Sequence, residues 1–189
     1  MGPLSLAILL AAAPTVEPCA YDRVAMLALD QRAFDQDLRG GWRVLARDTR
    51  CMAMAADLIR DYREAHGLTT TILYWHEGQM RAEAGQYEEA IALFDRARHA
   101  EPDEIGWNHY VDASIAFLRR DLPALRRART ALAAVRRPPG FAPVDVHGSP
   151  ANIIWPLNLN VVDALLTCFG QSYALAYRCS RPNTHRTGH

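Results

Sequence analysis

Apolar positions along most of the chain recur at intervals of three and four residues, the spacing of one face of an α-helix. In the clearest stretch, Ala90, Leu93, Phe94 and Ala97 form such a stripe. Glycine, proline or capping residues separate the periodic stretches from one another. The pattern predicts helices over residues 21–38, 42–46, 52–66, 72–84, 87–100, 107–118, 122–135, 161–169 and 173–177.

The predicted ends of these helices rest on residue types that stop or cap a helix. Gly40-Gly41 and Gly67 are expected to end the first and third helices, because glycine accepts the backbone angles of a helix end. Capping residues are expected before the helices that follow them: Asp48-Thr49, Thr69-Thr70-Thr71, Asp103, Asp121, and Asn158 or Asn160. Pro123 is tolerated in the first turn of its helix.

The stretch 74–102 carries the most specific pattern in the chain. It resembles a tetratricopeptide repeat in the places of its small, aromatic and proline residues, which are Gly78, Gly85, Tyr87, Ala90, Phe94, Ala97 and Pro102. The period of that family is 34 residues, and Ala113 follows Gly78 by 35. Glu77 departs from the pattern, because the family usually has leucine there.

Neighbouring units keep this spacing and lose most of the signature, so the resemblance covers residues 42–135 and is convincing only in its middle third. Arg129 stands where Phe94 stood, and Leu125 where Ala90 stood. The resemblance implies an all-α fold, a short α-solenoid of antiparallel helix pairs with a capping C-terminal helix. Gly78 and Ala90 would be small where two helices cross, with Phe94 beside them.

A groove lined by the first helix of each repeat is the binding surface that the resemblance implies. Trp and Tyr are enriched at binding hot spots, and several aromatic residues occur here. The implied groove residues are Ile72, Trp75, Gln79, Glu83, Trp107, Tyr110, Ser114 and Phe117. An alternative stays open: the C-terminal helix and the loop before it would cover these aromatics and make them part of the core.

A proline-rich loop over residues 141–156 follows the repeats. It is long for a connection within a compact domain, and long loops are often functional or mobile. Residues 161–169 are apolar nearly all round, so we expect that helix to be buried and to close the end of the stack.

The charge balance sets limits on partners. Lys and Arg number 21, as do Asp and Glu, so the net charge is zero and no general attraction to nucleic acid is expected. The largest basic run is Arg119-Arg120, Arg126-Arg127, Arg129 and Arg136-Arg137. Such a run could bind an acidic partner, although runs of this kind more often form solvated faces.

The N-terminal residues indicate export. Residues 4–13 are apolar and match the length of a signal-peptide core, but are too short for a bilayer, which needs about 20 residues. We expect residues 1–20 to be a signal peptide with a short leader, 21–180 a single domain and 181–189 a flexible tail. The alternative is a cytoplasmic protein whose N-terminal stretch packs on the core.

The cysteines fit the same expectation. Cys19, Cys51, Cys168 and Cys179 form no C-x-x-C pair, so they favour disulfides in an exported chain over a metal site. The bacterial periplasm is the expected compartment. No other stretch is apolar enough to span a membrane, so we expect no membrane insertion of the mature chain.

No catalytic motif is recognisable. His76-Glu77 begins an H-E-x-x-H pattern, but Met80 replaces the second histidine; His185 and His189 lie in the expected tail. We expect no metal, cofactor or catalysis. The favoured function is binding of a protein or peptide. The alternatives are an immunity-type antagonist of a secreted toxin, which is a more specialised binder, and an enzyme.

Overall fold

The structure is a computed structural model that describes residues 18–144, 148–151 and 153–179. Most of these residues are helical and none lies in a β-strand, which confirms the predicted all-α class. An isolated bridge joins Val144 to Pro150 in the long loop. The expected signal peptide and tail, with His185 and His189, lie outside the described residues.

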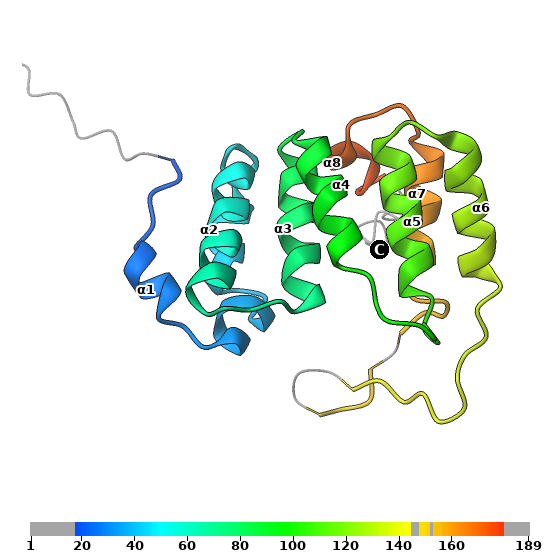
Figure 1. Cartoon of the computed structure of the whole chain (residues 1–189), viewed down its shortest axis with the longest axis horizontal. Coiled ribbons are helices and arrows are strands. Elements are labelled where there is room, and N and C mark those ends of the chain that lie inside the picture. Colours follow the sequence, from blue (N-terminus) through cyan, green and yellow to red (C-terminus); the bar gives the residue numbers. More distant parts are fainter. Residues whose placement is uncertain (1–17, 145–147, 152, 180–189) are drawn as a thin grey trace, which may run out of the picture.

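The longer helices stand side by side in chain order (Figure 1). Helix α7 packs against α5 and α6, and α8 packs against α3 and α7. The elements in order are α1 Arg23–Leu27, η1 Arg32–Gln36, η2 Gly41–Arg47, η3 Thr49–Cys51, α2 Met52–Ala65, α3 Thr71–Glu83, α4 Tyr87–Arg96, α5 Trp107–Leu118, α6 Leu122–Ala133, α7 Leu159–Thr167 and α8 Tyr173–Ala176.

The first predicted helix is wrong, because residues 21–38 form two short elements, α1 and the π-helix η1. The side chain of Asp30 accepts a hydrogen bond from Ala33 N at 2.8 Å and so starts a new turn. Phe34 is buried, but Val24 and Leu38 are 79% and 76% exposed. The apolar spacing therefore predicted one continuous buried face, but only part of that face is buried.

The other predicted helices are present, with ends displaced by a few residues. Helix α5 has the predicted bounds, whereas α4 ends at Arg96 and not at residue 100, so Arg98 and His99 lie beyond it. Helix α7 spans Leu159–Thr167 in place of residues 161–169, and only Val162, Ala164 and Leu165 of it are buried. The expected burial of α7 is met in part: Leu159, Val161 and Leu166 are partly buried against the core, whereas Asn160 and Thr167 are exposed.

Capping follows the prediction in part. Asp121 accepts a hydrogen bond from Ala124 N at 2.9 Å, as expected, and Pro123 lies in the first turn of α6. The threonine hydroxyls do not cap α3, although Thr70 is its N-cap residue. The remaining predicted caps also differ: Asp48 caps η3 and not α2, Asp103 reaches Asn108 N from outside α5, and Asn158 makes no side-chain cap.

Helices α3 and α4 pack as the small residues predict. A Cβ atom added to Gly78 would lie 2.7 Å from Cδ1 of Phe94, so only glycine leaves room for that ring. Phe94 and Ala90 are fully buried. Gly85, between the two helices, has a φ of +79°, a left-handed angle that glycine accepts readily.

The core consists of two clusters of buried side chains that meet at α3. Leu73 and Met80 of α3 belong to the N-terminal cluster with α2, η1 and η2. Tyr74 and Trp75 of α3 belong to the C-terminal cluster with α4 to α8. Opposite faces of α3 thus supply both clusters, and Ile72 packs against each.

The unexpected Glu77 is explained by a buried ion pair between α2 and α3. Arg63 donates to Glu77 Oε2 from Nε at 3.1 Å and from Nη2 at 2.8 Å, and both residues are buried. Burial raises the pKa of Glu77, and the guanidinium of Arg63 opposes that shift. Removing one partner of such a pair leaves an uncompensated buried charge.

All four cysteines are paired. Cys19 is bonded to Cys51, and Cys168 to Cys179, with Cα–Cα distances of 5.5 and 6.3 Å. The expected pair of disulfides is therefore present, and the structure supplies the pairing that the spacing left open. Within the described ranges, no helix has the length and apolar character needed to cross a membrane.

Candidate functional site

The side chains at the centre of the predicted groove are buried. Trp75, Tyr110 and Phe117 are 3%, 2% and 1% exposed, and Ser114 is fully buried. The rings of Trp75 and Tyr110 lie 4.6 Å apart between centroids. Burial raises the pKa of Tyr110 well above its usual value, and the neighbouring Tyr177 adds a smaller effect in the same direction.

The C-terminal segment of the same chain covers this surface. Gln79 Nε2 donates to the hydroxyl of Tyr177 at 3.0 Å, and that hydroxyl lies 3.3 Å from the hydroxyl of Tyr110. Arg178 pairs with Glu83, and α8 contributes the buried Tyr173. In this structure the predicted groove is occupied, and partner binding by its aromatics stays a prediction that requires α8 to move.

The two remaining groove residues also have intramolecular partners. Trp107 is half-buried, donates from Nε1 to Ala97 O at 2.7 Å, and stacks on His99. Ile72 is half-buried between the two core clusters. Both side chains therefore contribute to packing within the chain, and each stays partly exposed.

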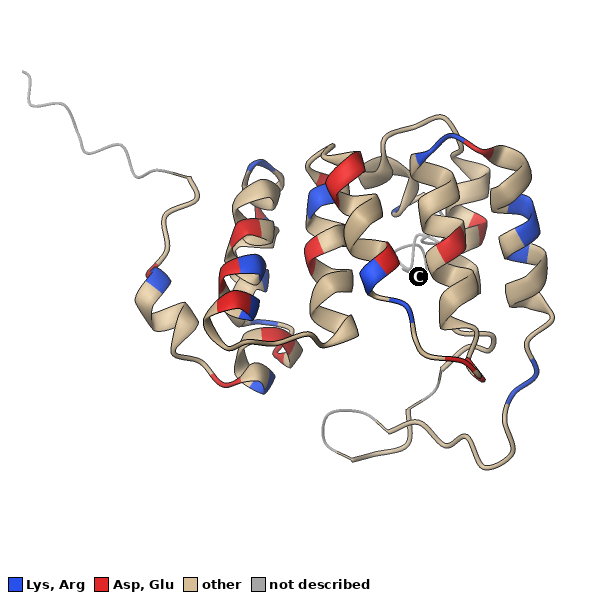
Figure 2. Ribbon diagram, in the orientation of Figure 1, with Lys and Arg blue, Asp and Glu red and all other residues tan. Residues whose placement is uncertain are grey.

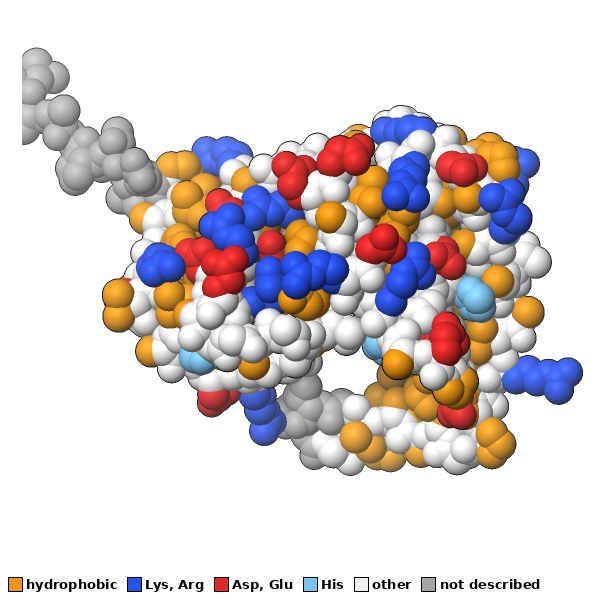
Figure 3. Space-filling model, viewed as in Figure 1, with side chains coloured by type: hydrophobic (Ala, Val, Ile, Leu, Met, Phe, Trp, Pro, Cys, Tyr) orange, Lys and Arg blue, Asp and Glu red, His pale blue; other side chains and the backbone are white. Residues whose placement is uncertain are grey.

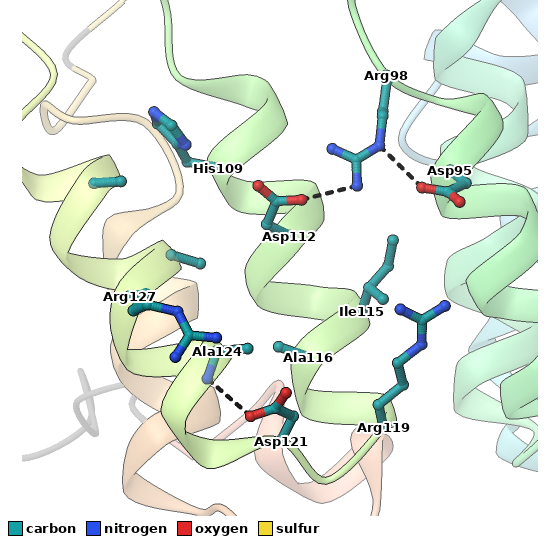
Figure 4. A pocket seen from close by; sticks show the side chains of 12 residues that line it. Asp95, Arg98, His109, Asp112, Ile115, Ala116, Arg119, Asp121, Ala124 and Arg127 are labelled. Atoms are coloured by element: carbon teal, nitrogen blue, oxygen red, sulfur yellow. Dashed lines mark hydrogen bonds and ion pairs between the residues drawn. The ribbon is translucent and has the colours of Figure 1, made fainter.

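A second concave surface lies across α5 and is bordered by α4 and α6 (Figure 4). We call it the outer cleft, and its volume is about 380 Å³. Its lining comprises Asp95, Arg98, His109, Asp112, Ile115, Ala116, Arg119, Asp121, Ala124, Arg127, Ala128 and Ala131. This volume lies within the roughly 300–1,000 Å³ of ordinary ligand sites.

One end of the outer cleft is acidic. Arg98 donates from Nε to Asp95 Oδ1 at 2.9 Å and from Nη2 to Asp112 Oδ1 at 2.8 Å. One guanidinium is thus shared by two carboxylates, which leaves one excess negative charge. His109 lies beside Asp112 at this end (Figure 4).

The opposite end is basic. Arg119, which follows α5, and Arg127, on α6, are exposed and have no carboxylate partner among the described residues. The carboxylate of Asp121 lies between them in Figure 4 and caps α6. This end therefore has one excess positive charge, and its two guanidinium groups are available to a ligand.

The floor between the two ends is apolar. Ile115, Ala116 and Ala128 line it, and their side chains are only 6%, 5% and 7% exposed. Figure 3 views this face of the molecule and shows acidic and basic side chains interspersed with apolar ones over it. The surface therefore has charged groups at its margins and a small apolar area between them.

Other members of the predicted basic run have partners or point elsewhere. Figure 2 shows basic positions along α6, at the far side of the helical row from α2. Arg129 donates to Asp163 of α7 at 2.8 Å, and Arg137 donates to Phe141 O. Arg126 and Arg136 are exposed and do not line the outer cleft.

A buried polar cluster joins η1 to α3. Asp35 is fully buried, and its Oδ1 lies 2.7 Å from His76 Nδ1 and 2.9 Å from Trp42 Nε1. Burial tends to raise the pKa of Asp35, but the hydrogen bond and charge of His76, with Trp42 and Arg43, lower it overall. His76 therefore has a structural partner, and the described residues contain no group of three or more side chains suited to hold a metal ion.

No protein-family model, curated protein or solved structure matches the chain.

Sequence reasoning located part of this site and missed the rest. The basic run contained Arg119 and Arg127, but nothing distinguished them from Arg126 or Arg136. Asp95, Arg98 and Asp112 were missed, because residues 14 positions apart meet only after α4 and α5 pack together. Arg119, Arg126, Arg127 and Arg136 are all exposed, so only the packing of α4, α5 and α6 shows which of them line the outer cleft.

Proposed function

We propose that the chain is an exported, TPR-like interaction domain that binds a protein or peptide partner and catalyses no reaction. The observation that carries this proposal is the outer cleft, in which an apolar floor lies between charged ends. Arg119 and Arg127 have no partner among the described residues, so an external ligand can bind them without breaking an existing ion pair.

The repeat architecture is part of the same proposal. We infer that α3 with α4, and α5 with α6, are successive TPR-like antiparallel pairs, and that α7 closes the end of the stack. The close approach of Gly78 to Phe94 and the packing of α7 on α5 and α6 support this. In such stacks each unit contacts mainly its neighbours, and the outer cleft lies on the surface of α4, α5 and α6.

We place partner binding on the outer cleft and not on the predicted groove. The groove aromatics already pack against α8, and exposing them would cost the burial of Tyr173 and the contacts of Tyr177. The outer cleft requires no rearrangement, and binding surfaces generally change little on complex formation.

Export is supported by the paired cysteines, because structural disulfides persist mainly in oxidising compartments. We propose the bacterial periplasm. Cell fractionation of a bacterium that expresses the full chain tests the proposed compartment. Alkylation of the denatured, unreduced protein tests whether the cysteines are paired. We expect a periplasmic protein with all four thiols blocked; a cytoplasmic protein with free thiols would contradict it.

Quantitative affinity capture from cell-envelope extract tests the binding site. We expect the double variant Arg119→Gln/Arg127→Gln to lose the captured partner by several-fold relative to the unchanged chain. The matched control is Arg126→Gln/Arg136→Gln, which removes the same charge from exposed arginines outside the outer cleft. Equal losses in both variants, or in neither, would place the partner elsewhere.

A further inference from the structure

The outer cleft carries opposite charges at its two ends (Figure 4). The Asp95–Arg98–Asp112 group has one excess negative charge, and the Arg119–Asp121–Arg127 group has one excess positive charge. A polyanion such as nucleic acid would be attracted at one end and repelled at the other. The charge pattern favours a ligand that carries both signs.

The acidic end has acceptor atoms to spare. Arg98 uses only the Oδ1 atom of Asp95 and of Asp112. Within the described residues, the Oδ2 atoms of both carboxylates have no hydrogen-bond partner, and both side chains are exposed. These oxygens can accept hydrogen bonds from an ammonium or guanidinium group without displacing Arg98.

The distance between the two ends sets the spacing of the ligand's charges. Asp112 and Arg119 are seven positions apart along α5 and its C-terminal end, which corresponds to about 10 Å of helix rise. A peptide in the polyproline II conformation advances about 3.1 Å per residue with three residues per turn, so side chains three positions apart lie on one face. A ligand that reaches both ends therefore has its opposite charges about three residues apart.

The floor defines what lies between those charges. Ile115, Ala116 and Ala128 present small apolar surfaces, and the cleft volume is about 380 Å³. Aliphatic side chains of the ligand can cover this floor, but its residues are only 5–7% exposed, so the area removed from water and the resulting gain are small and the charged ends dominate recognition.

We infer that the outer cleft binds a short peptide segment in the polyproline II conformation, with an acidic residue, two aliphatic residues and a basic residue in succession. The acidic side chain pairs with Arg119 and Arg127, and the basic side chain pairs with Asp95 and Asp112. The aliphatic side chains lie on Ile115, Ala116 and Ala128. This inference rests on the proposed function, because it names the ligand class of the same site.

Titration of the isotope-labelled full chain, followed by NMR chemical shifts, tests the inference. The probe is Glu-Leu-Leu-Lys with blocked ends, compared with Gln-Leu-Leu-Gln and with a single-stranded oligonucleotide. We expect shifts centred on α5 and α6 and about tenfold weaker binding of the uncharged peptide. Added salt is expected to weaken binding of the charged peptide, because it screens exposed charges.

Variants locate the contacts. Arg119→Gln and Arg127→Gln should each raise Kd about twofold to fivefold, the range expected for an exposed ion pair, and the double variant about tenfold. Asp112→Asn should weaken the charged peptide and leave the uncharged one unchanged. The control Arg126→Gln should alter Kd less than twofold, and circular dichroism confirms that each variant is folded.

The inference is overturned if the charged and uncharged peptides bind equally, if neither binds, or if the oligonucleotide binds more tightly at the same residues. Partner capture distinguishes a wrong ligand class from a wrong binding site. If Arg119→Gln/Arg127→Gln loses the captured partner while the peptide fails to bind, the ligand class is wrong and the site stands. If capture is unaffected, the outer cleft itself is wrong.

Discussion

At the scale of single residues, buried polar side chains fix contacts that apolar spacing does not reveal. Glu77 faces Arg63 between α2 and α3, and Asp35 joins His76 to Trp42. Each side chain stands at a position where helical periodicity allows either a core or a surface residue. Their partners are 7 to 41 residues away in sequence, so only the folded structure reveals them.

The closeness of α3 and α4 depends on Gly78. We expect Gly78→Ala to lower the free energy of unfolding by about 1–3 kcal/mol, because the new methyl group would overlap the ring of Phe94. Denaturant unfolding measures this loss. In the Phe94→Leu background, Gly78→Ala should lower the free energy of unfolding by less, because the effects of substitutions at two contacting residues are not additive. Equal costs in both backgrounds would show that the contact is not responsible.

Asp35 should make stability depend on pH. The pKa of Asp35 is lowered in the folded protein, so its carboxylate stabilises the fold above its unfolded pKa of about 3.9. This contribution disappears as pH falls through the folded pKa. We expect Asp35→Asn to cost about 1–3 kcal/mol at pH 7, and we expect the difference from the unchanged protein to shrink below about pH 4.

Denaturant unfolding between pH 3 and pH 7 measures that difference. Asp37→Asn, at an exposed position of the same segment, is the matched control, with an expected change within about 0.5 kcal/mol. A cost of Asp35→Asn that grows on acidification would contradict the assignment.

At the scale of elements, the sequence predicted the helices from α2 to α8 and their order well. Strong periodicity, together with glycine and proline at the ends, carries that information locally. The N-terminal helix was wrong because the Asp30 side chain interrupts a continuous apolar spacing. The groove was implied by the resemblance to a tetratricopeptide repeat, and that resemblance does not show that α8 packs on the same side of α3 and α5.

The covering of the groove by α8 should depend on the second disulfide. Cys168 and Cys179 close a short loop around α8, with a sequence separation of 11. We expect Cys168→Ser/Cys179→Ser to lower the free energy of unfolding by about 2–3 kcal/mol, by releasing a constraint on the unfolded chain. Backbone amides of residues 173–178 should also exchange faster with solvent.

Hydrogen exchange followed by mass spectrometry measures this change. Leu175→Ala is the control, because Leu175 is 60% exposed and the substitution should leave exchange in α5 and α8 nearly unchanged. Exchange of α8 that stays as slow as that of α5 after loss of the disulfide would contradict a tethering role for that bond.

At the scale of the whole molecule, α3 links two core clusters while the outer cleft lies on α4 to α6. The N-terminal cluster with Cys19–Cys51 and the C-terminal cluster with Cys168–Cys179 each contain one disulfide. The charged ends of the outer cleft come from α4, α5 and α6 and from residues at their ends, and the C-terminal cluster maintains the packing of these helices. The candidate site is thus a property of the assembled helices, which explains why individual motifs did not identify it.

An arginine-modification footprint of the chain bound to its captured partner, read by mass spectrometry after reaction with phenylglyoxal, tests binding at the outer cleft directly. We expect Arg119 and Arg127 to become protected from modification in the complex, while Arg126 and Arg136 react as in the free chain. A complex in which Arg119 and Arg127 stay as reactive as in the free chain would contradict binding at the outer cleft.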